Sequence, residues 1–335
     1  MAIELLDETI PEGSAKWVEL NVTNDLDMSP LSVHLHVING EADGPTLWLQ
    51  GNIHGNEQAG GLAFRDFMLE LSPEDVSGTI IGAPVVNPTA FRNKQRTDPI
   101  GEDQFGTNDV NRAFPGTEGG SYPQALAHRV FTTAEDGIDY FIGSHSTTGE
   151  ITMYPGFTVV LETGDEVYDE SVELATASDI PYLLEFDSGD IQGSMYEQLA
   201  ERGVVAILFE TGDSSLIEHE AYDTAYKAIK NAAKHLDMIA GEPVRENEIS
   251  HHKGQYFLTA REGGFFESFI ESEDEVTEGQ RIGEITNIKG ETVDTFEAPF
   301  DGVMVQFRTF PTARPGDPVF SIFPEEGVDG MTNIE

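Results

Sequence analysis

Apolar positions in the first two thirds of the chain alternate between the spacing of strands and the spacing of helices. Residues 46–50 form a short apolar run that favours a β-strand, and residues 58–71 repeat their apolar positions at the helical period. The same alternation predicts further strands at 79–86, 139–145, 182–186 and 204–209, and further helices at 123–135, 166–178, 194–202 and 218–239. Two alternating segments near the start, 16–22 and 31–38, are typical of edge strands. This order predicts an α/β fold with a mixed central sheet that helices cover on both faces.

The pattern changes after residue 243. From 251 to 323 the chain has short alternating strands and glycine turns, with no helical repeat. This predicts a small all-β domain of about 80 residues, which is within the usual range for a domain. We therefore expect a catalytic domain over residues 1–243 and an all-β domain over residues 244–335.

Composition narrows the class of protein. The chain has 335 residues, of which 39% are hydrophobic, so it can bury a core. No stretch approaches the roughly 20 apolar residues of a membrane span, and the first residues lack the basic start and apolar run of a signal peptide, so we expect a cytoplasmic protein. The absence of cysteine excludes thiol nucleophiles and leaves histidine and carboxylates as metal ligands.

The charge is strongly acidic, with 61 acidic and 18 basic residues and a formal net charge of −43. Such self-repulsion destabilises a compact state in dilute buffer, but molar salt shortens the Debye length to about 3 Å and screens it. We expect a halophilic protein, with an acidic protein of an ordinary cell as the alternative. Neither nucleic acid nor an anionic membrane is expected as a partner, because both are bound by basic patches.

Polar residues suited to chemistry follow the predicted strands. His54 and Glu57 come between the strand at 46–50 and the helix that follows, and Asn87, His145 and Glu210 end three later strands. Ligands of open α/β sheets bind at the carboxyl ends of the strands. A catalytic zinc ion takes three protein ligands and lowers the pKa of bound water to about 7. His54, Glu57 and His145 would supply these ligands, and Glu210 would be the general base and acid.

Each residue also has an ordinary structural interpretation. Glu57 would be favoured at a helix N-terminus by the macrodipole, His145 could be a buried histidine satisfied by backbone groups, and Glu210 a paired carboxylate. The shared position at one sheet edge favours the metal site over three separate coincidences.

A set of short motifs carries a family resemblance. The strings are His54-Gly55-Asn56-Glu57, Asn87-Pro88-x-Ala90, Arg96, Asp109-x-Asn111-Arg112-x-Phe114-Pro115-Gly116, His145 and Glu210-Thr211-Gly212. In this order they resemble the succinylglutamate desuccinylase and aspartoacylase family of the zinc carboxypeptidase-like superfamily. The resemblance covers most of residues 46–212, and residues 89–121, which show little periodicity, hold several of the motifs.

The resemblance implies a role for each matching residue. His54, Glu57 and His145 would bind one Zn²⁺ ion per chain, and Glu210 would activate the zinc-bound water. Arg96 would stabilise the oxyanion, and Asp109 would orient the first histidine, as an oxygen beside a ligating imidazole usually does. Asn111 and Arg112 would hold a substrate carboxylate, which a guanidinium matches with two hydrogen bonds; ordinary surface ion pairs are the alternative for both arginines.

We also expect Asn87 and Tyr154 to contact substrate. One position departs from the family, which commonly has Asp two residues before the second histidine ligand, where this chain has Gly143. In this detail Ser144-His145-Ser146 and Tyr154-Pro155 look more like the peptidase branch of the superfamily.

Residues 251–323 resemble a barrel-sandwich domain of the lipoyl and biotinyl type. In carrier domains of this type a lysine at a hairpin tip is modified, and Lys289-Gly290 falls near that turn. Its flanks, Ile288 and Gly290, differ from those of a modified lysine, so we expect a structural hairpin turn. A domain that restricts substrate size or mediates assembly is the favoured interpretation.

Together these observations predict a zinc-dependent deacylase that hydrolyses the amide bond of a small anionic N-acyl amino acid. A zinc carboxypeptidase acting on short peptides is the second hypothesis, and a non-catalytic metal-binding or carrier protein is the third. The sequence leaves open the acyl group, the amine and whether the chain forms a homo-oligomer.

Overall fold

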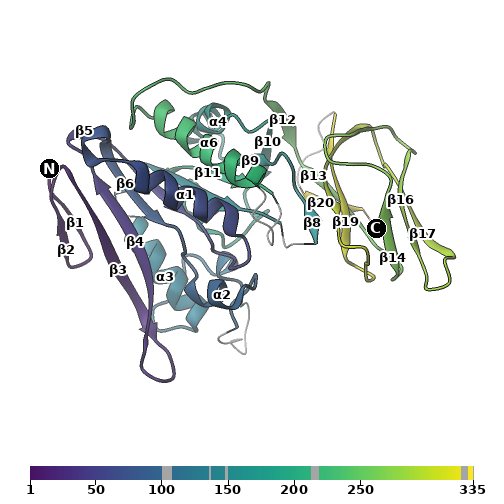
Figure 1. Ribbon diagram of the computed structural model, residues 1–335, viewed down its shortest axis with the longest axis horizontal. Helices are drawn as coiled ribbons and strands as arrows, with labels where there is room; N and C mark the ends of the chain where they lie inside the picture. The colour runs from purple at the N-terminus through teal and green to yellow at the C-terminus, as the bar shows by residue number, and fades with distance from the viewer. Residues whose placement is uncertain (100–107, 136, 148–149, 213–218, 326–330, 335) are drawn as a thin grey trace.

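A nine-stranded mixed sheet forms the centre of the molecule (Figure 1). The computed structural model describes residues 1–99, 108–135, 137–147, 150–212, 219–325 and 331–334. The strand order is β12-β10-β9-β11-β7-β5-β6-β4-β3. In chain order these strands are β3 (Ser14–Asn24), β4 (Pro30–Asn39), β5 (Ala42–Gln50), β6 (Ser77–Ala83), β7 (Tyr140–His145), β9 (Phe157–Glu162), β10 (Tyr182–Asp187), β11 (Val205–Glu210) and β12 (Ser250–Lys253).

The middle of this sheet is parallel. β11, β7, β5 and β6 run in the same direction, while β9 is antiparallel to β11 and β4 is antiparallel to β6. One expectation from the sequence is wrong: β4 lies between β3 and β6 and is not an edge strand. The structure also has a strand, β9, that the sequence analysis does not predict.

Helices cover both faces of the sheet, as the alternating pattern predicts. On one face α1 (Gln58–Glu70), α4 (Glu166–Ala177) and α6 (His219–His235) bury Phe64, Leu174 and Ile229 against the strands. On the other face α3 (Tyr122–Ala134) and α5 (Met195–Ala200) bury Leu126 and Leu199 in a second core. Because both faces are apolar and covered, polar groups of the central strands gather at the strand ends.

The segment between β6 and α3 is less irregular than its sequence suggests. It contains α2 (Pro88–Asn93) and the 3₁₀ turn η2 (Val110–Arg112), and a further 3₁₀ turn, η1 (Pro73–Asp75), precedes β6. These pieces are too short for a periodic signal. Residues 100–107 of the same segment lie outside the described part of the chain.

Two smaller sheets make up the C-terminal region. One joins β15 (Glu275–Val276), β18 (Gly302–Arg308), β19 (Pro318–Pro324), β13 (Gln255–Thr259) and β20 (Met331–Ile334), and the other joins β14 (Phe265–Ser268), β16 (Arg281–Thr286) and β17 (Thr292–Glu297). Phe266, Phe296 and Phe320 pack edge to face in the core between them. Lys289 lies in the turn between β16 and β17.

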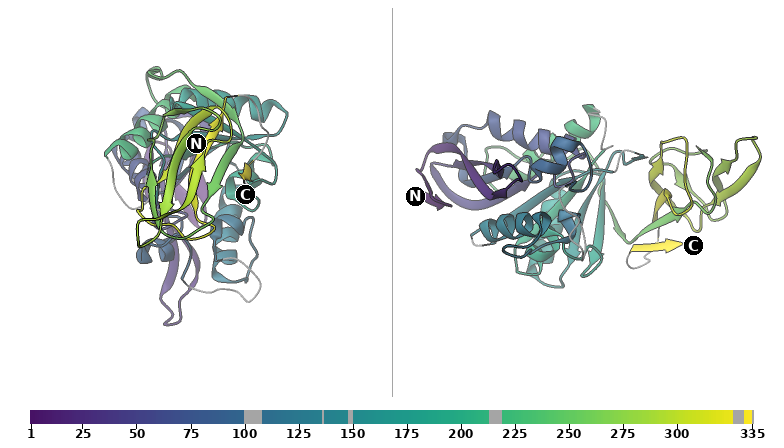
Figure 2. Two further views of the ribbon diagram at one scale, coloured as in Figure 1. Left: turned by 90° about the vertical axis from the view of Figure 1, so that its right-hand side faces the viewer. Right: turned by 90° about the horizontal axis from the view of Figure 1, so that it is seen from below.

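The chain between the two regions packs on the central sheet. β12 pairs in parallel with β10, so residues 250–253, which the predicted division assigns to the second domain, complete the sheet of the first. The short strand β8 (Ile151–Thr152), which lies between β7 and β9 in the chain, pairs with β18 of the C-terminal region. The first hairpin, β1 (Ile3–Leu5) and β2 (Glu8–Ile10), lies at the opposite end of the molecule, and the two chain ends are far apart (Figure 2). Among the described helices none is both long and apolar enough to cross a membrane.

Candidate active site

The candidate site lies where the parallel strands end. β7 and β11 are neighbours in register, with His145 opposite Glu210, so both side chains leave the sheet on the same face. β5 ends beside them at Gln50, and the chain turns before α1, whose N-cap residue is Glu57. His54 lies in this turn. Three strand ends therefore bring two imidazoles and two carboxylates to one edge of the sheet.

His54, Glu57 and His145 form a buried triad. Their exposed fractions are only 1%, 2% and 6%. His54 Nδ1 is 2.7 Å from Glu57 Oε1, and His145 Nδ1 is 3.0 Å from Glu57 Oε2. One ligand atom from each residue lies within 4.8 Å of the others, so the triad could hold a metal ion.

The pairing of His54 fits a cation at this position. Its Nε2 lies 3.2 Å from Asp109 Oδ1, which accepts the ring N–H. A neutral imidazole then carries a lone pair on Nδ1. That buried atom faces Glu57 Oε1 at 2.7 Å. Burial lowers the pKa of His54, but Glu57 and Asp109 outweigh it and raise that pKa. Carboxylates beside both ring nitrogens favour a positive charge at this imidazole, which a proton or a metal ion can supply, and two imidazoles with one carboxylate are a common zinc ligand set.

The electrostatics of the triad suit metal binding. Burial raises the pKa of Glu57, but the two histidines outweigh it and hold that pKa well below the ordinary value. Burial, together with His54 and Arg96, lowers the pKa of His145 against the pull of Glu57. The carboxylate is therefore ionised and this imidazole neutral near pH 7, which are the forms that bind metals.

Glu210 differs from the other acids of the site. Burial and the negative charge of Glu57 raise its pKa well above the ordinary value, while Arg96 and Arg112 act in the opposite direction. Its side chain is only partly buried, so solvent reaches it. A carboxyl group with a raised pKa at the rim of a site is suited to accept and return a proton near neutral pH.

Asp109 joins the triad to the residues predicted to bind substrate. It accepts the N–H of Asn111 as the N-cap of η2, at 2.9 Å. Burial raises the pKa of Asp109, but His54, Arg96 and Arg112 outweigh it and lower that pKa to about 2. Arg96 Nη1 lies 2.8 Å from Glu57 Oε1, and its Nη2 lies 3.8 Å from Asp109 Oδ2. Arg96 thus contacts both the triad and its supporting acid.

Asn111 and Arg112 follow Asp109 on the turn η2. Asn111 is 8% exposed, whereas the Arg112 side chain is exposed and donates to the carbonyl oxygen of Asn111 at 2.7 Å. The positive charge of Arg112 acts to lower the pKa of Glu210, so the two side chains interact electrostatically.

Asn87 and Tyr154 are placed differently from the other predicted residues. Asn87 is fully buried and caps α2: its side chain accepts from Ala90 N and Thr89 Oγ1 and donates to Ile53 O. These contacts give it a structural role, fixing α2 against the turn that carries His54, and leave it no exposed surface for substrate. Tyr154 is 39% exposed and lines a separate cavity; no described contact joins its side chain to the triad.

Two glycines explain local features of the motifs. A Cβ at Gly55 would lie 2.0 Å from the carbonyl carbon of Ala90, so only glycine lets the His54 turn approach α2 this closely. At Gly143 a Cβ would lie 2.7 Å from Leu208 Cδ2 and 3.1 Å from the ring of Phe141. The space that the family's Asp would enter is therefore filled by apolar side chains.

Sequence reasoning missed two kinds of contact made by the chain after β7. The buried Arg308 of β18 pairs with Glu150 at 2.5 Å, and the Glu150 carbonyl accepts the N–H of Thr309 at 2.9 Å. Closer to the triad, the backbone N–H of Ser146 donates to Glu57 Oε2 at 3.3 Å. Backbone donors and contacts between distant segments leave no signal in a sequence motif.

Comparison with known proteins gives a consistent result. Residues 43–236 match the model of the succinylglutamate desuccinylase/aspartoacylase catalytic domain. The N-alpha-acetyl-L-2,4-diaminobutyric acid deacetylase of Halomonas elongata is 25% identical over 314 residues, which are 90% of this chain and 89% of that protein.

Solved structures share the fold. A product-bound structure of the ectoine utilization protein EutE (DoeB) from Ruegeria pomeroyi superposes with a TM-score of 0.83 at 23% identity, covering 92% of this chain and 95% of that chain. A succinylglutamate desuccinylase/aspartoacylase from Rhodobacter sphaeroides has a TM-score of 0.82 at 22% identity, covering 94% and 96%. The likeness extends over both the central sheet and the C-terminal region.

Proposed function

Because the chain belongs to the succinylglutamate desuccinylase/aspartoacylase family, we propose that it is a zinc-dependent deacylase that hydrolyses the amide bond of an N-acyl amino acid. The observation that carries this proposal is the buried triad of His54, Glu57 and His145, with Glu210 in register beside His145. Two imidazoles and one carboxylate whose ligand atoms lie within 4.8 Å of one another are a set that a zinc ion takes.

A divalent ion held by the triad would polarise the acyl carbonyl and make water a stronger nucleophile. Glu210 takes the proton of the attacking water as the water oxygen bonds to the acyl carbon. The carbon–nitrogen bond then breaks, and Glu210 returns the proton to the departing amine nitrogen. A carboxyl with a raised pKa serves both steps because it gains and loses a proton near the working pH.

The two arginines would act on different parts of the substrate. Arg96, which contacts Glu57, is close enough to the triad to stabilise the negative charge that develops on the acyl oxygen. Arg112 and Asn111, on the exposed side of Asp109, would hold the carboxylate of the amino acid. Asp109 positions all of these groups by binding His54 and capping η2.

Nα-acetylated amino acids with a short side chain are the first substrates to test, since the relative from Halomonas elongata is a deacetylase of N-acetyl-2,4-diaminobutyric acid. The strongly acidic composition further suggests that the protein works in high salt.

The experiment is a release assay over acetyl, formyl and succinyl derivatives of 2,4-diaminobutyrate, aspartate and glutamate, with short unacylated peptides as a comparison class. We expect release of the acyl group from at least one N-acyl amino acid and no cleavage of the peptides. Cleavage of peptides without deacylation would favour a carboxypeptidase instead.

A further inference from the structure

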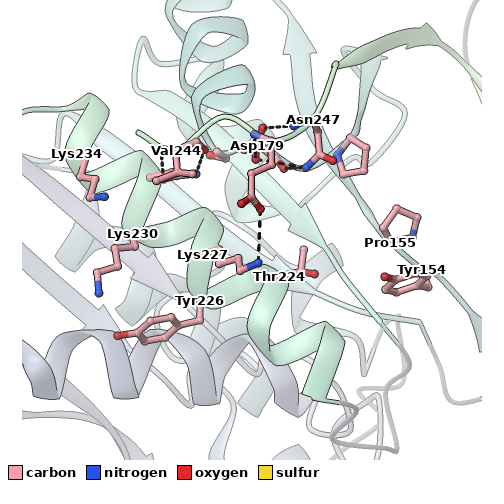
Figure 3. Close-up of a pocket in the computed structure, with 14 residues that line it drawn as sticks. Tyr154, Pro155, Asp179, Thr224, Tyr226, Lys227, Lys230, Lys234, Val244 and Asn247 are labelled. Carbon is pink, nitrogen blue, oxygen red and sulfur yellow. Dashed lines mark hydrogen bonds and ion pairs between the residues drawn. The ribbon is translucent and has the colours of Figure 1, made fainter. Parts of the chain in front are cut away.

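A cavity of about 490 Å³ lies between α6, the turn after α4 and the segment 244–247 (Figure 3). Neither the triad nor Glu210 lines it. Its volume is in the range of small-molecule sites, which is roughly 300–1,000 Å³. The cavity is therefore large enough for a ligand that the proposed reaction does not use.

A row of lysines lines this cavity. Lys227, Lys230 and Lys234 extend from one side of α6 (Figure 3). The whole chain has only seven lysines and a net charge of −43, yet three of the seven fall within eight residues of one helix. At a rise of 1.5 Å per residue the first and last of them are about 10 Å apart along the helix. The row concentrates positive charge at one place on a strongly acidic molecule.

Two acidic residues, Asp179 and Glu246, also line the cavity and offset part of this charge. The carboxylate of Asp179 is occupied by the backbone N–H groups of Glu246 at 2.9 Å and Asn247 at 3.1 Å. Glu246 is mostly exposed and approaches only Lys227, at 3.7 Å. Within the described part of the chain no carboxylate lies within 4.0 Å of the Lys230 or Lys234 ammonium group.

Hydrogen bonds fix the segment 244–247, which forms another wall of the cavity. The side-chain amide of Asn231 donates to the carbonyl of Val244 at 2.8 Å and accepts the N–H of the same residue at 2.9 Å. Asn231 is only 5% exposed, so this pair is protected from water. Because the segment 244–247 is tied both to α6 and to Asp179, the cavity is formed before any ligand arrives, which lowers the entropic cost of binding.

We propose that this cavity binds a small molecule with two anionic groups about 10 Å apart, bound by the lysine row of α6. Ammonium groups on flexible stems bind phosphates and carboxylates as point charges. The cavity also adjoins the catalytic edge: Tyr154 and Pro155 line it, and the next residue, Gly156, packs so closely on Glu210 that a Cβ there would lie 2.4 Å from the Glu210 carbonyl oxygen. A ligand at this place contacts the segment that packs against the proposed general base.

Calorimetric titration of the full-length protein tests this proposal. The probes are fructose 1,6-bisphosphate, which carries two phosphates at the ends of a six-carbon chain, and azelate, which carries two carboxylates at the ends of a nine-carbon chain. The test variant is the double substitution Lys230→Gln with Lys234→Gln. The matched control is Lys16→Gln with Lys289→Gln, which removes the same charge far from the cavity.

We expect the wild type and the control to bind one of the two probes, and the test variant to bind it at least tenfold more weakly while keeping its thermal transition and its basal deacylase activity. The preferred probe then identifies phosphate or carboxylate as the recognised group. Equal binding by both double variants, or no binding of either probe to the wild type at millimolar concentration, would overturn the proposal.

Discussion

The strand ends and the segment that follows β6 contribute to the same site in different ways. At the strand ends, His54, Glu57 and His145 are almost completely buried and are placed by sheet register. In the segment after β6, Arg96 and Arg112 lie on short turns; the Arg96 side chain is partly exposed and the Arg112 side chain is exposed. The charged groups of the triad are therefore shielded from water, whereas the two guanidinium groups are in contact with it.

This difference separates the expected roles of the two regions. A buried ligand set has fixed geometry and strong electrostatics, because little solvent screens it. Exposed guanidinium groups are screened by solvent and salt. Each therefore contributes only a modest binding free energy when it pairs with a substrate carboxylate. We infer that the strand ends hold the metal and the general base, and that the segment after β6 adds Arg96 for the developing oxyanion and Arg112 for the substrate carboxylate.

The largest effect is expected from His145→Ala. Removing one of three ligands should abolish tight metal binding and lower kcat/KM by at least about 10³-fold, since a catalytic metal is worth several kcal/mol. Metal analysis and steady-state kinetics measure both. The exposed His251 offers a matched control, and His251→Ala should change neither quantity. Retention of full metal content by the His145 variant would remove that residue from the site.

Glu210→Gln should have the next largest effect. The amide keeps the shape but cannot take a proton, so we expect kcat to fall by roughly 10²-fold or more while the metal stays bound. Metal content and kcat are measured on the same preparation. Undiminished turnover would show that another group moves the proton, and loss of the metal would make Glu210 a ligand.

Asp109→Asn tests the residue that joins the two regions. The substitution weakens the acceptor for His54 Nε2–H, so metal affinity should fall by roughly 10- to 100-fold, as it does for other supporting acids. Competition with a chelator measures the affinity. If only KM changed and the metal affinity did not, Asp109 would belong to substrate binding alone.

Arg112→Gln should act on the substrate and not on the metal. Loss of one partly screened ion pair should raise KM by roughly tenfold and change kcat little. The kinetics need a control at a surface arginine, and Arg65, which pairs with Asp66 on α1, is suitable. A fall in kcat with unchanged KM would place Arg112 in the chemical step.

The smallest effect is expected in the pH profile of the same variant. Glu210 must be ionised to act as base, so kcat/KM falls as the pH drops through its pKa. Arg112 lowers that pKa; its loss should therefore move the acidic limb to higher pH. The change should be less than about one pH unit in dilute buffer and should shrink in molar KCl, because salt screens an exposed charge. A shift to lower pH would contradict the sign.

The sequence also predicts the site residues of these two regions to different extents. The strand-end residues could be found because an apolar run, a polar residue and a turn recur in the same order, and the parallel arrangement then brings the ends together. The contact of Arg96 with Glu57 spans 39 positions and depends on turns too short to show a period. Asn87 shows the limit of strand-end reasoning, because its side chain caps a helix inside the protein instead of facing the site.

The departure at Gly143 has a similar explanation. The sequence shows that the family's Asp is missing, but not what occupies its place. The structure fills that space with Leu208 and Phe141. Packing between neighbouring strands decides this, and neighbours in a sheet such as β7 and β11 are 60 or more residues apart in the chain.

Metal reconstitution combined with acyl release is the most direct test of the proposed site. The purified protein is stripped with a chelator, titrated with Zn²⁺ and assayed for acetate release from an Nα-acetyl amino acid at each step. We expect activity to vanish on stripping and to return in proportion to the metal, reaching its maximum at one ion per chain. Full activity in the stripped protein would contradict the metal site at His54, Glu57 and His145.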